Sequence, residues 1–248
     1  MLKKDRMATS WINYIVDLLF PISCKLCGIS AHSGRTPGLC EGCWGAIRFI
    51  TEPCCPCCGN PFASDSALIY SPDHVCGDCR ERPPHYDRAI SVAIYESALA
   101  EAIQLFKYSK KTNWSRPLGH LLLKRVSDFP LADVLLPVPL HARRLREREF
   151  NQSLLLAREV SAYCRMPLQV DNLRRIRWTR PQIELNGVDR KKNVRGAFEV
   201  KWPDQVCELS VLLIDDVFTT GATVNECARV LKGAGAKTVY VLTVARMV

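Results

Sequence analysis

The sequence lacks a long apolar run. Its apolar stretch near the start, Trp11 to Phe20, is short and carries Asn13 and Asp17. A membrane-spanning helix needs about 20 consecutive apolar residues, so we expect no membrane span. No small-x-small cleavage site follows this stretch, which argues against a secretory signal. We therefore expect a cytoplasmic protein whose residues 1–22 form an amphipathic helix.

Several catalytic signatures are also absent. The sequence has no Walker loop, no Rossmann fingerprint and no Ser-His-Asp set, and its five histidines show no ligand or triad spacing. The composition of the 248 residues, 48% hydrophobic and 24% charged, is ordinary for a globular protein. It excludes low-complexity disorder, collagen and a coiled coil as descriptions of the whole chain.

Positive charge is unevenly distributed. The net charge of the chain is +9, and all of it lies in residues 81–200, which hold 22 Lys and Arg against 13 Asp and Glu. The segments on either side are neutral. A basic middle indicates a phosphate-bearing partner, either a nucleic acid or a phosphorylated small molecule. A merely soluble basic surface is the alternative.

Ten of the 13 cysteines lie between Cys24 and Cys79. They include four C-x2-C pairs, in which two thiolates can bind one ion. The pairs are Cys24/Cys27, Cys40/Cys43, Cys55/Cys58 and Cys76/Cys79. The spacing between pairs is typical of zinc ribbons, and four thiolates around one ion form a closed, structural site. We therefore expect a double zinc ribbon over residues 23–85 with two structural zinc ions.

Three alternatives concern the cysteines. A disulfide framework requires an oxidising compartment, which a cytoplasmic protein does not meet. Cys54/Cys57 is a competing pair in shifted register, although Gly59 after Cys58 favours Cys55/Cys58 because a glycine there permits positive φ. The sequence does not decide between sequential and cross-braced pairing of the four pairs.

The C-terminal part of the chain has the pattern of a β-α-β unit. A buried strand from Ser210 ends at Asp215 and Asp216. A Thr/Gly loop follows, then a helix over Val224–Lys232 and a strand over Thr238–Ala245. Ligands of such sheets bind beyond the carboxyl ends of the strands, and loop amides at a helix start bind phosphate.

Paired carboxylates beside a phosphate loop suit a ligand with both a phosphate and a vicinal diol, as in a 5-phosphoribosyl group. The segment resembles the 5-phosphoribosyl-1-diphosphate (PRPP) motif of type I phosphoribosyltransferases. The resemblance implies that Asp215 and Asp216 meet the ribose hydroxyls, that the loop wraps the 5′-phosphate, and that Mg²⁺ accompanies the diphosphate. The implied PRPP-binding residues are Asp215, Asp216, Val217, Phe218, Thr219, Thr220, Gly221, Ala222 and Thr223.

Further motifs narrow the family. They are Leu136–His141, Arg143–Ser153, Arg175–Gln182 and Arg190–Phe198, together with the cysteine pairs and a terminal Ala-Arg. The chain resembles the ComF family (ComFC/GntX-like proteins) over nearly its whole length. One departure is Glu149, where the family usually has Gly. The resemblance implies a role in natural transformation or DNA utilisation, with single-stranded DNA, a ComFA-type helicase and recombination proteins as partners.

The basic middle supplies candidates for contact with diphosphate or DNA. They are Pro139, His141, Arg143, Arg144, Arg146, Arg148, Arg190, Lys191 and Lys192. The first arginines follow a predicted strand, Asp133–Leu136, and begin an apparent helix that continues through Leu154–Val160. The last three lie in a polar stretch with the pattern of a mobile lid. Five aromatics between basic residues fit either base stacking or the core: Phe106, Tyr108, Trp114, Phe150 and Trp178.

The expected fold is α/β. It has a mainly parallel sheet with helices on both faces, like type I phosphoribosyltransferases, over residues 86–248 and after the double zinc ribbon. Its first strand is Asp87–Tyr95 and its first helix Ser97–Tyr108.

Three functions remain open. The first is a Mg²⁺-dependent phosphoribosyltransferase with an unknown acceptor, the second is a non-catalytic adaptor for single-stranded DNA with a vestigial or regulatory PRPP site, and the third is a nucleotide-salvage phosphoribosyltransferase. Thr219 disfavours salvage of 6-oxopurines, because the resembling enzymes have an acid there and a threonine offers no useful pKa.

Overall fold

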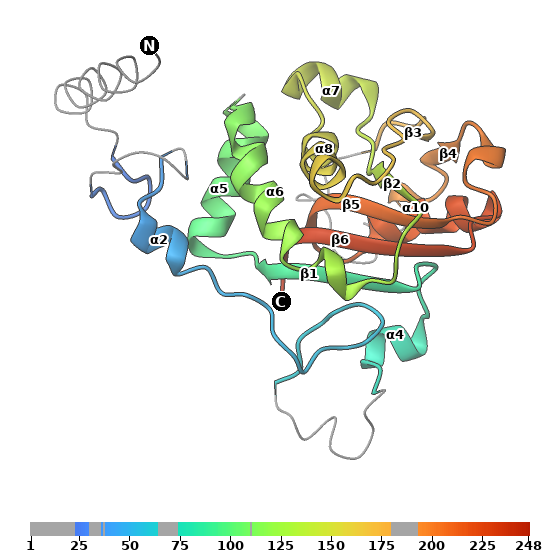
Figure 1. The fold of residues 1–248 in the computed structure, drawn as a ribbon, viewed down its shortest axis with the longest axis horizontal. Helices are drawn as coiled ribbons and strands as arrows, with labels where there is room; N and C mark the ends of the chain where they lie inside the picture. Colours follow the sequence, from blue (N-terminus) through green and yellow to red (C-terminus); the bar gives the residue numbers. More distant parts are fainter. Residues whose placement is uncertain (1–22, 30–35, 37, 64–73, 110, 180–192) are drawn as a thin grey trace, which may run out of the picture.

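The computed structural model describes residues 23–29, 36, 38–63, 74–109, 111–179 and 193–248. Their main element is a four-stranded parallel sheet in the order β1-β6-β5-β2 (Figure 1). The strands are β1 (Arg88–Ile94), β2 (Val134–Pro137), β5 (Ser210–Phe218) and β6 (Thr238–Arg246). A short antiparallel pair, β3 (Leu173–Arg175) and β4 (Phe198–Val200), forms a second sheet.

Helices cover both faces of the parallel sheet. The longer ones are α5 (Ser97–Tyr108), α6 (Ser115–Leu123), α8 (Gln152–Cys164) and α10 (Ala222–Gly233). Helices α6 and α8 pack together over β6, β5 and β2, whereas α10 lies on the opposite face against β6 and β4 (Figure 1). The predicted α/β fold with a parallel sheet and helices on both faces is therefore confirmed.

The central strand β5 shows why this sequence forms a two-sided sheet. Leu212 and Ile214 belong to the core beneath α5, α6 and α8, whereas Val211 and Leu213 belong to the core beneath α10. A strand buried on both faces requires apolar residues at consecutive positions, and 211–214 supply them. The expected strands and helices lie where the pattern predicts, and the bounds of α5 are the predicted ones.

One local prediction is wrong. The apparent continuous helix from the arginines to Val160 is two helices, α7 (Ala142–Arg148) and α8. Glu149 ends α7 in the left-handed region, with φ of 69°. The Asn151 side chain then accepts a hydrogen bond from the Ser153 N–H at 3.0 Å and begins α8. Left-handed backbone and an Asn cap both interrupt a helix.

The cysteine-rich segment packs directly on the α/β layer. The first part, with helix α2 (Glu41–Gly45), lies beside α5, and Trp44 contacts Trp114 with ring centroids 6.0 Å apart (Figure 1). The second part, with helix α4 (Gly77–Glu81), joins β1 through a hydrogen bond from the Ala89 N–H to the Cys57 carbonyl at 2.8 Å.

The predicted N-terminal amphipathic helix, 1–22, lies outside the described residues. Within the described parts of the chain, no helix combines the length and apolar character that crossing a membrane requires.

Candidate ligand pocket and metal sites

A cavity of about 450 Å³ opens where all four parallel strands end. Tyr95 follows β1, Pro139 follows β2, Met247 follows β6, and Asp215 to Thr219 contribute from β5 and the loop after it. The carboxyl edge of a parallel sheet is the usual place for a ligand in such folds. The cavity is therefore the candidate ligand pocket.

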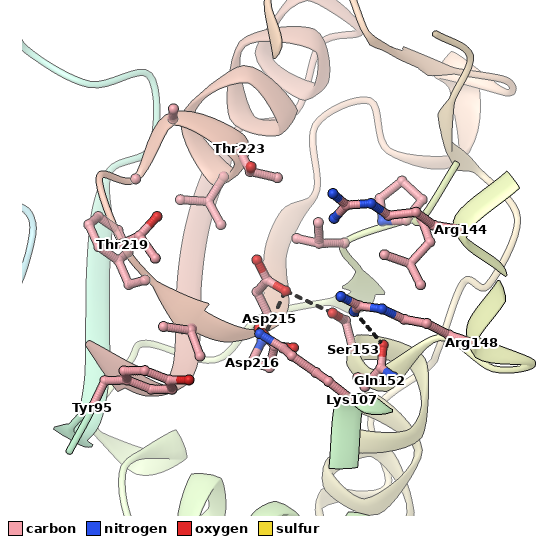
Figure 2. A pocket seen from close by; sticks show the side chains of 18 of the residues that line it. Tyr95, Lys107, Arg144, Arg148, Gln152, Ser153, Asp215, Asp216, Thr219 and Thr223 are labelled. Atoms are coloured by element: carbon pink, nitrogen blue, oxygen red, sulfur yellow. Dashed lines mark hydrogen bonds and ion pairs between the residues drawn. The ribbon is translucent and has the colours of Figure 1, made fainter. Parts of the chain in front are cut away.

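Two carboxylates lie side by side on the pocket floor. Ser153 Oγ donates to Asp215 Oδ1 at 2.8 Å, and the Asp216 N–H donates to the same oxygen at 2.9 Å. Lys107 Nζ forms an ion pair with Asp216 Oδ1 at 2.9 Å, and Figure 2 shows this lysine reaching the acid pair from α5. The two acids thus have different partners.

Asp215 holds a proton more tightly than an ordinary carboxyl group. Burial, and next the neighbouring Asp216 charge, raise the pKa of Asp215 to about 7, although Ser153 and Lys107 act in the opposite direction. A buried carboxylate beside another is unfavourable unless a cation or hydroxyl donors approach it. The floor of the pocket is therefore suited to a ligand that donates hydrogen bonds or carries a cation.

The loop after β5 bends sharply around one aromatic ring. Gly221 has φ of 70°, and a Cβ there would lie 2.5 Å from Cζ of Phe218. A glycine is required at such a position because any side chain would clash. The loop leads into α10, whose first residues Ala222 and Thr223 line the pocket together with Thr219. A helix start with loop amides is a phosphate-binding arrangement.

Positive side chains face the acid pair. Arg144 and Arg148 come from α7, Arg175 from the end of β3 and Lys107 from α5. Figure 2 shows Arg144 and Arg148 extending toward the cavity from the side opposite Thr219. Burial, and next the charge of Arg144, lower the pKa of Arg175, and its buried Nε has no hydrogen-bond partner among the residues that the structure describes. An uncompensated buried donor favours an anionic ligand.

Most of the predicted pocket residues line this cavity. They are Asp215, Asp216, Val217, Phe218, Thr219, Gly221, Ala222 and Thr223, with Pro139, Arg144 and Arg148 from the basic middle. Thr220 does not line it, and its buried Oγ1 has no hydrogen-bond partner in the described part of the chain.

The other candidates lie elsewhere. His141 begins α7, where its Nδ1 accepts a hydrogen bond from the Arg143 N–H at 3.2 Å, and neither residue lines the cavity, nor does Arg146. Arg190, Lys191 and Lys192, with the expected lid, lie outside the described residues.

The five candidate aromatics divide into two groups. Phe106 and Trp114 are fully buried, and Phe150 packs on Phe106 with centroids 5.8 Å apart. Tyr108 is 58% exposed at the pocket mouth with the Arg148 guanidinium 5.2 Å from its ring centroid. Trp178 lies 4.7 Å from the Arg143 guanidinium. Only the last two are therefore available for base stacking.

Six residues with polar groups line the pocket although no sequence pattern singles them out as ligand contacts: Tyr95, Gln104, Lys107, Gln152, Ser153 and Arg175. Arg175 begins one of the family motifs, and Ser153 ends another, so position in a motif was the available signal. Lys107 lies on a helix whose pattern indicates only packing, and no sequence signal links it to Asp216.

The first four cysteines of the pairs form one cluster. The sulfur atoms of Cys24, Cys27, Cys40 and Cys43 all lie within 4.8 Å of one another. The chain turns at Gly28, whose φ is 73°. We call this cluster the first tetrad.

Cys55, Cys58, Cys76 and Cys79 form the second tetrad under the same distance limit. Cys54 lies outside it and donates to the Thr51 carbonyl at 3.2 Å. The structure thus groups the pairs sequentially and in the Cys55/Cys58 register. A hydrogen bond from the Cys58 side chain lowers the pKa of Cys55 to about 4 despite burial. Hydrogen bonds from backbone N–H groups, including that of Cys76, act in the same direction.

Both tetrads fit a structural zinc ion. Four sulfur donors match the donor set of closed, structural zinc sites. The double zinc ribbon family model matches residues 15–82 of the chain, which include both tetrads.

Curated relatives match almost the whole chain. DNA utilization protein YhgH of Escherichia coli K12 is 34% identical over 235 residues, covering 92% of this chain and 99% of the relative. Competence protein F of Haemophilus influenzae is 31% identical over 92% of this chain and 98% of its own. Competence protein ComFC of Bacillus subtilis is 28% identical and covers 79% of each chain.

The solved structures that match this chain cover about half of it. Glutamine PRPP amidotransferase from Bacillus subtilis has a TM-score of 0.37 and 22% identity, covering 52% of this chain and 25% of that one. Hypoxanthine phosphoribosyltransferase from Staphylococcus aureus has a TM-score of 0.30 and 14% identity, covering 55% and 62%.

Proposed function

This chain belongs to the ComF family of competence and DNA-utilization proteins. We propose that its pocket binds PRPP with Mg²⁺ and that this binding is part of its role in DNA utilisation. One observation carries the proposal. An acid pair, a Thr/Gly loop at a helix start and four cationic side chains line the same cavity. A ligand with a diol, a phosphate and a diphosphate would meet a complementary group at each position.

The roles follow from the chemistry of each side chain. Asp215 and Asp216 accept hydrogen bonds from the two ribose hydroxyls, which relieves the repulsion between the carboxylates. The loop from Thr219 to Thr223 holds the 5′-phosphate through its N–H and hydroxyl donors. Mg²⁺ would neutralise the diphosphate together with the guanidinium groups of Arg144, Arg148 and Arg175, since planar guanidinium groups bind phosphate oxygens in pairs.

Calorimetric titration of PRPP and Mg²⁺ into zinc-loaded protein tests this proposal. We expect saturable binding that is lost in the double variant Asp215→Asn/Asp216→Asn. Asp204→Asn is the matched control, because this exposed acid lies outside the pocket and its loss should change nothing. Absence of binding by the parent protein, or equal binding by the double variant, would overturn the proposal.

A second proposed function is the binding of single-stranded DNA at the mouth of the pocket, where Tyr108 lies, and on the surface of α7 beside it. The Arg148–Tyr108 and Arg143–Trp178 pairs place guanidinium groups beside aromatic rings. Bases stack on such rings while arginines neutralise phosphates.

Fluorescence anisotropy with a labelled oligothymidine at two salt concentrations tests the proposed DNA binding. Tyr108→Ala should weaken binding about tenfold, as expected for loss of one stacked base. Tyr163→Ala, an exposed tyrosine on α8 away from the pocket, is the control.

An enzyme and a non-catalytic adaptor with this pocket would differ in turnover. A phosphoribosyltransferase releases diphosphate from PRPP when its acceptor is present, whereas an adaptor binds without release. Measuring diphosphate release with and without single-stranded DNA separates the two. Nucleotide salvage is less supported, because Thr219 stands where salvage enzymes for 6-oxopurines have an acid, and salvage would require release with a free base alone.

A further inference from the structure

One buried arginine lies between the second tetrad and Phe218, a residue that lines the pocket. Arg246, the last residue of β6, is only 7% exposed. Its Nη1 donates to the Cys58 carbonyl at 2.7 Å, its Nε donates to Asn60 Oδ1 at 3.2 Å, and its Nη2 lies 3.9 Å from Cys58 Sγ. All three contacts are with the turn that follows Cys55, which we call the Cys58 knuckle (residues 55–60).

The described part of the chain gives the charge of Arg246 no carboxylate partner. Among the described residues, no acidic side chain forms an ion pair with it. A buried and uncompensated guanidinium is strongly unfavourable. Four thiolates around one Zn²⁺ carry net negative charge, so zinc-loaded cysteines of the second tetrad supply the missing counter-charge.

The same guanidinium lies over the ring that shapes the phosphate loop. It is 4.5 Å from the centroid of Phe218, and β5 and β6 pair at these two residues. Phe218 in turn fills the space beneath Gly221, where a Cβ would lie 2.5 Å from its ring. A displaced Phe218 would therefore alter the path of the loop from Thr219 to Thr223.

We propose that Arg246 is a positioning residue through which zinc in the second tetrad regulates the affinity of the pocket for its phosphorylated ligand. The inference rests on the proposed PRPP-binding function. Zinc fixes the Cys58 knuckle, the knuckle fixes the guanidinium, and the guanidinium fixes Phe218 under the loop. Among the described residues the first tetrad has no such connection, since its core neighbours include Trp44 and Trp114 on the other side of the sheet from Phe218.

The first test compares arginine variants in zinc-loaded protein. Arg246→Gln should weaken PRPP binding about tenfold, within the range typical of coupled sites, and Arg246→Lys should give an intermediate loss because it keeps the charge without the planar fork. Arg125→Gln is the matched control. Arg125 also joins the cysteine-rich segment to the α/β layer, through Ile50, but does not line the pocket.

The second test needs no turnover. Coupling is reciprocal, so PRPP should slow zinc transfer from one of the two tetrads to a chromophoric chelator and leave the other unchanged. In ligand-free protein, amide hydrogen exchange in the segment 217–223 should be faster in Arg246→Gln than in wild type and unchanged in Arg125→Gln.

The outcomes separate this inference from the function on which it rests. Normal PRPP affinity in Arg246→Gln, or zinc release that PRPP leaves unchanged while it binds, would overturn the coupling and leave PRPP binding in place. If wild type binds no PRPP, the proposed function fails, and hydrogen exchange decides the inference alone. Unchanged exchange in Arg246→Gln would then refute it as well.

Discussion

Replacing Asp215 by Asn is expected to make the protein more stable, although under the proposed function it would weaken ligand binding. The pKa of this carboxyl group rises from 3.8 to about 7 on folding, because of burial and the adjacent Asp216. Each pH unit between these values is worth about 1.4 kcal/mol, so the ionised group costs the fold at most about 4 kcal/mol above pH 7. Water in the open cavity raises the effective dielectric constant, and we expect a gain of about 2 kcal/mol from Asp215→Asn.

The pH dependence follows from the sign of the shift. A folded state that binds a proton more tightly than the unfolded state loses stability as pH rises between the two pKa values. The advantage of Asp215→Asn should therefore be negligible below pH 4, grow between pH 4 and 7, and stay constant above. Urea unfolding at pH 4.5, 6 and 8 measures it.

Asp216→Asn is the matched comparison. Asp216 is the direct partner of Lys107, 2.9 Å away, and both side chains are largely buried. Removing one partner of such a pair leaves an unpaired charge, so we expect a loss of about 1 kcal/mol instead of a gain. The reasoning would be refuted if Asp215→Asn were destabilising, if its gain were independent of pH, or if the two variants behaved alike.

Three further predictions concern backbone and metal. Glu149→Gly should raise the free energy of unfolding by about 0.5–1 kcal/mol, since Glu149 has φ of 69° and left-handed backbone costs residues other than glycine about 1–2 kcal/mol. A lower free energy of unfolding in urea would contradict this. Gly59→Ala should destabilise more than Gly28→Ala in thermal melts. Both glycines have positive φ, but a Cβ at Gly59 would lie 2.6 Å from the Ala89 carbonyl oxygen and one at Gly28 meets nothing within 4 Å. Equal effects would show that the knuckle does not dock on β1. Chelation of zinc should shift tryptophan emission, because the first tetrad packs beside Trp44 and Trp114, and unchanged emission would contradict that packing.

The regular elements were predictable because their signals are local. Four consecutive apolar residues before an acid pair indicate a two-sided strand, and the spacing over Ser97–Tyr108 indicates a helix with one buried face. The break between α7 and α8 was not predictable from periodicity, since Glu149 has no intrinsic preference for left-handed backbone. Its position in the family motif, where glycine is usual, was the available signal.

The pocket was predictable only in part. Asp215 to Thr223 are contiguous, so a single motif identified the segment that contains them. Lys107, Ser153 and Arg175 come from three other elements that meet only when the sheet order β1-β6-β5-β2 brings the strand ends together. The partner of each acid depends on that order. The exposure of Tyr108 at the pocket mouth likewise could not be predicted without the fold. Phe106 and Tyr108 are two residues apart on one helix, and only Phe106 is buried.

The two tetrads share a ligand pattern but differ in what they touch. The first contributes Cys24 to the core with Trp114 and α5, and the second contributes Cys55, Cys58 and Cys79 to the core that contains Phe218 and Ala222. Zinc bound in the first would therefore stabilise a helix layer, whereas zinc bound in the second would stabilise the face of the sheet that carries the loop from Thr219 to Thr223. A repeat in sequence thus has unequal consequences, and selective loss of the second ion should affect ligand binding more than loss of the first.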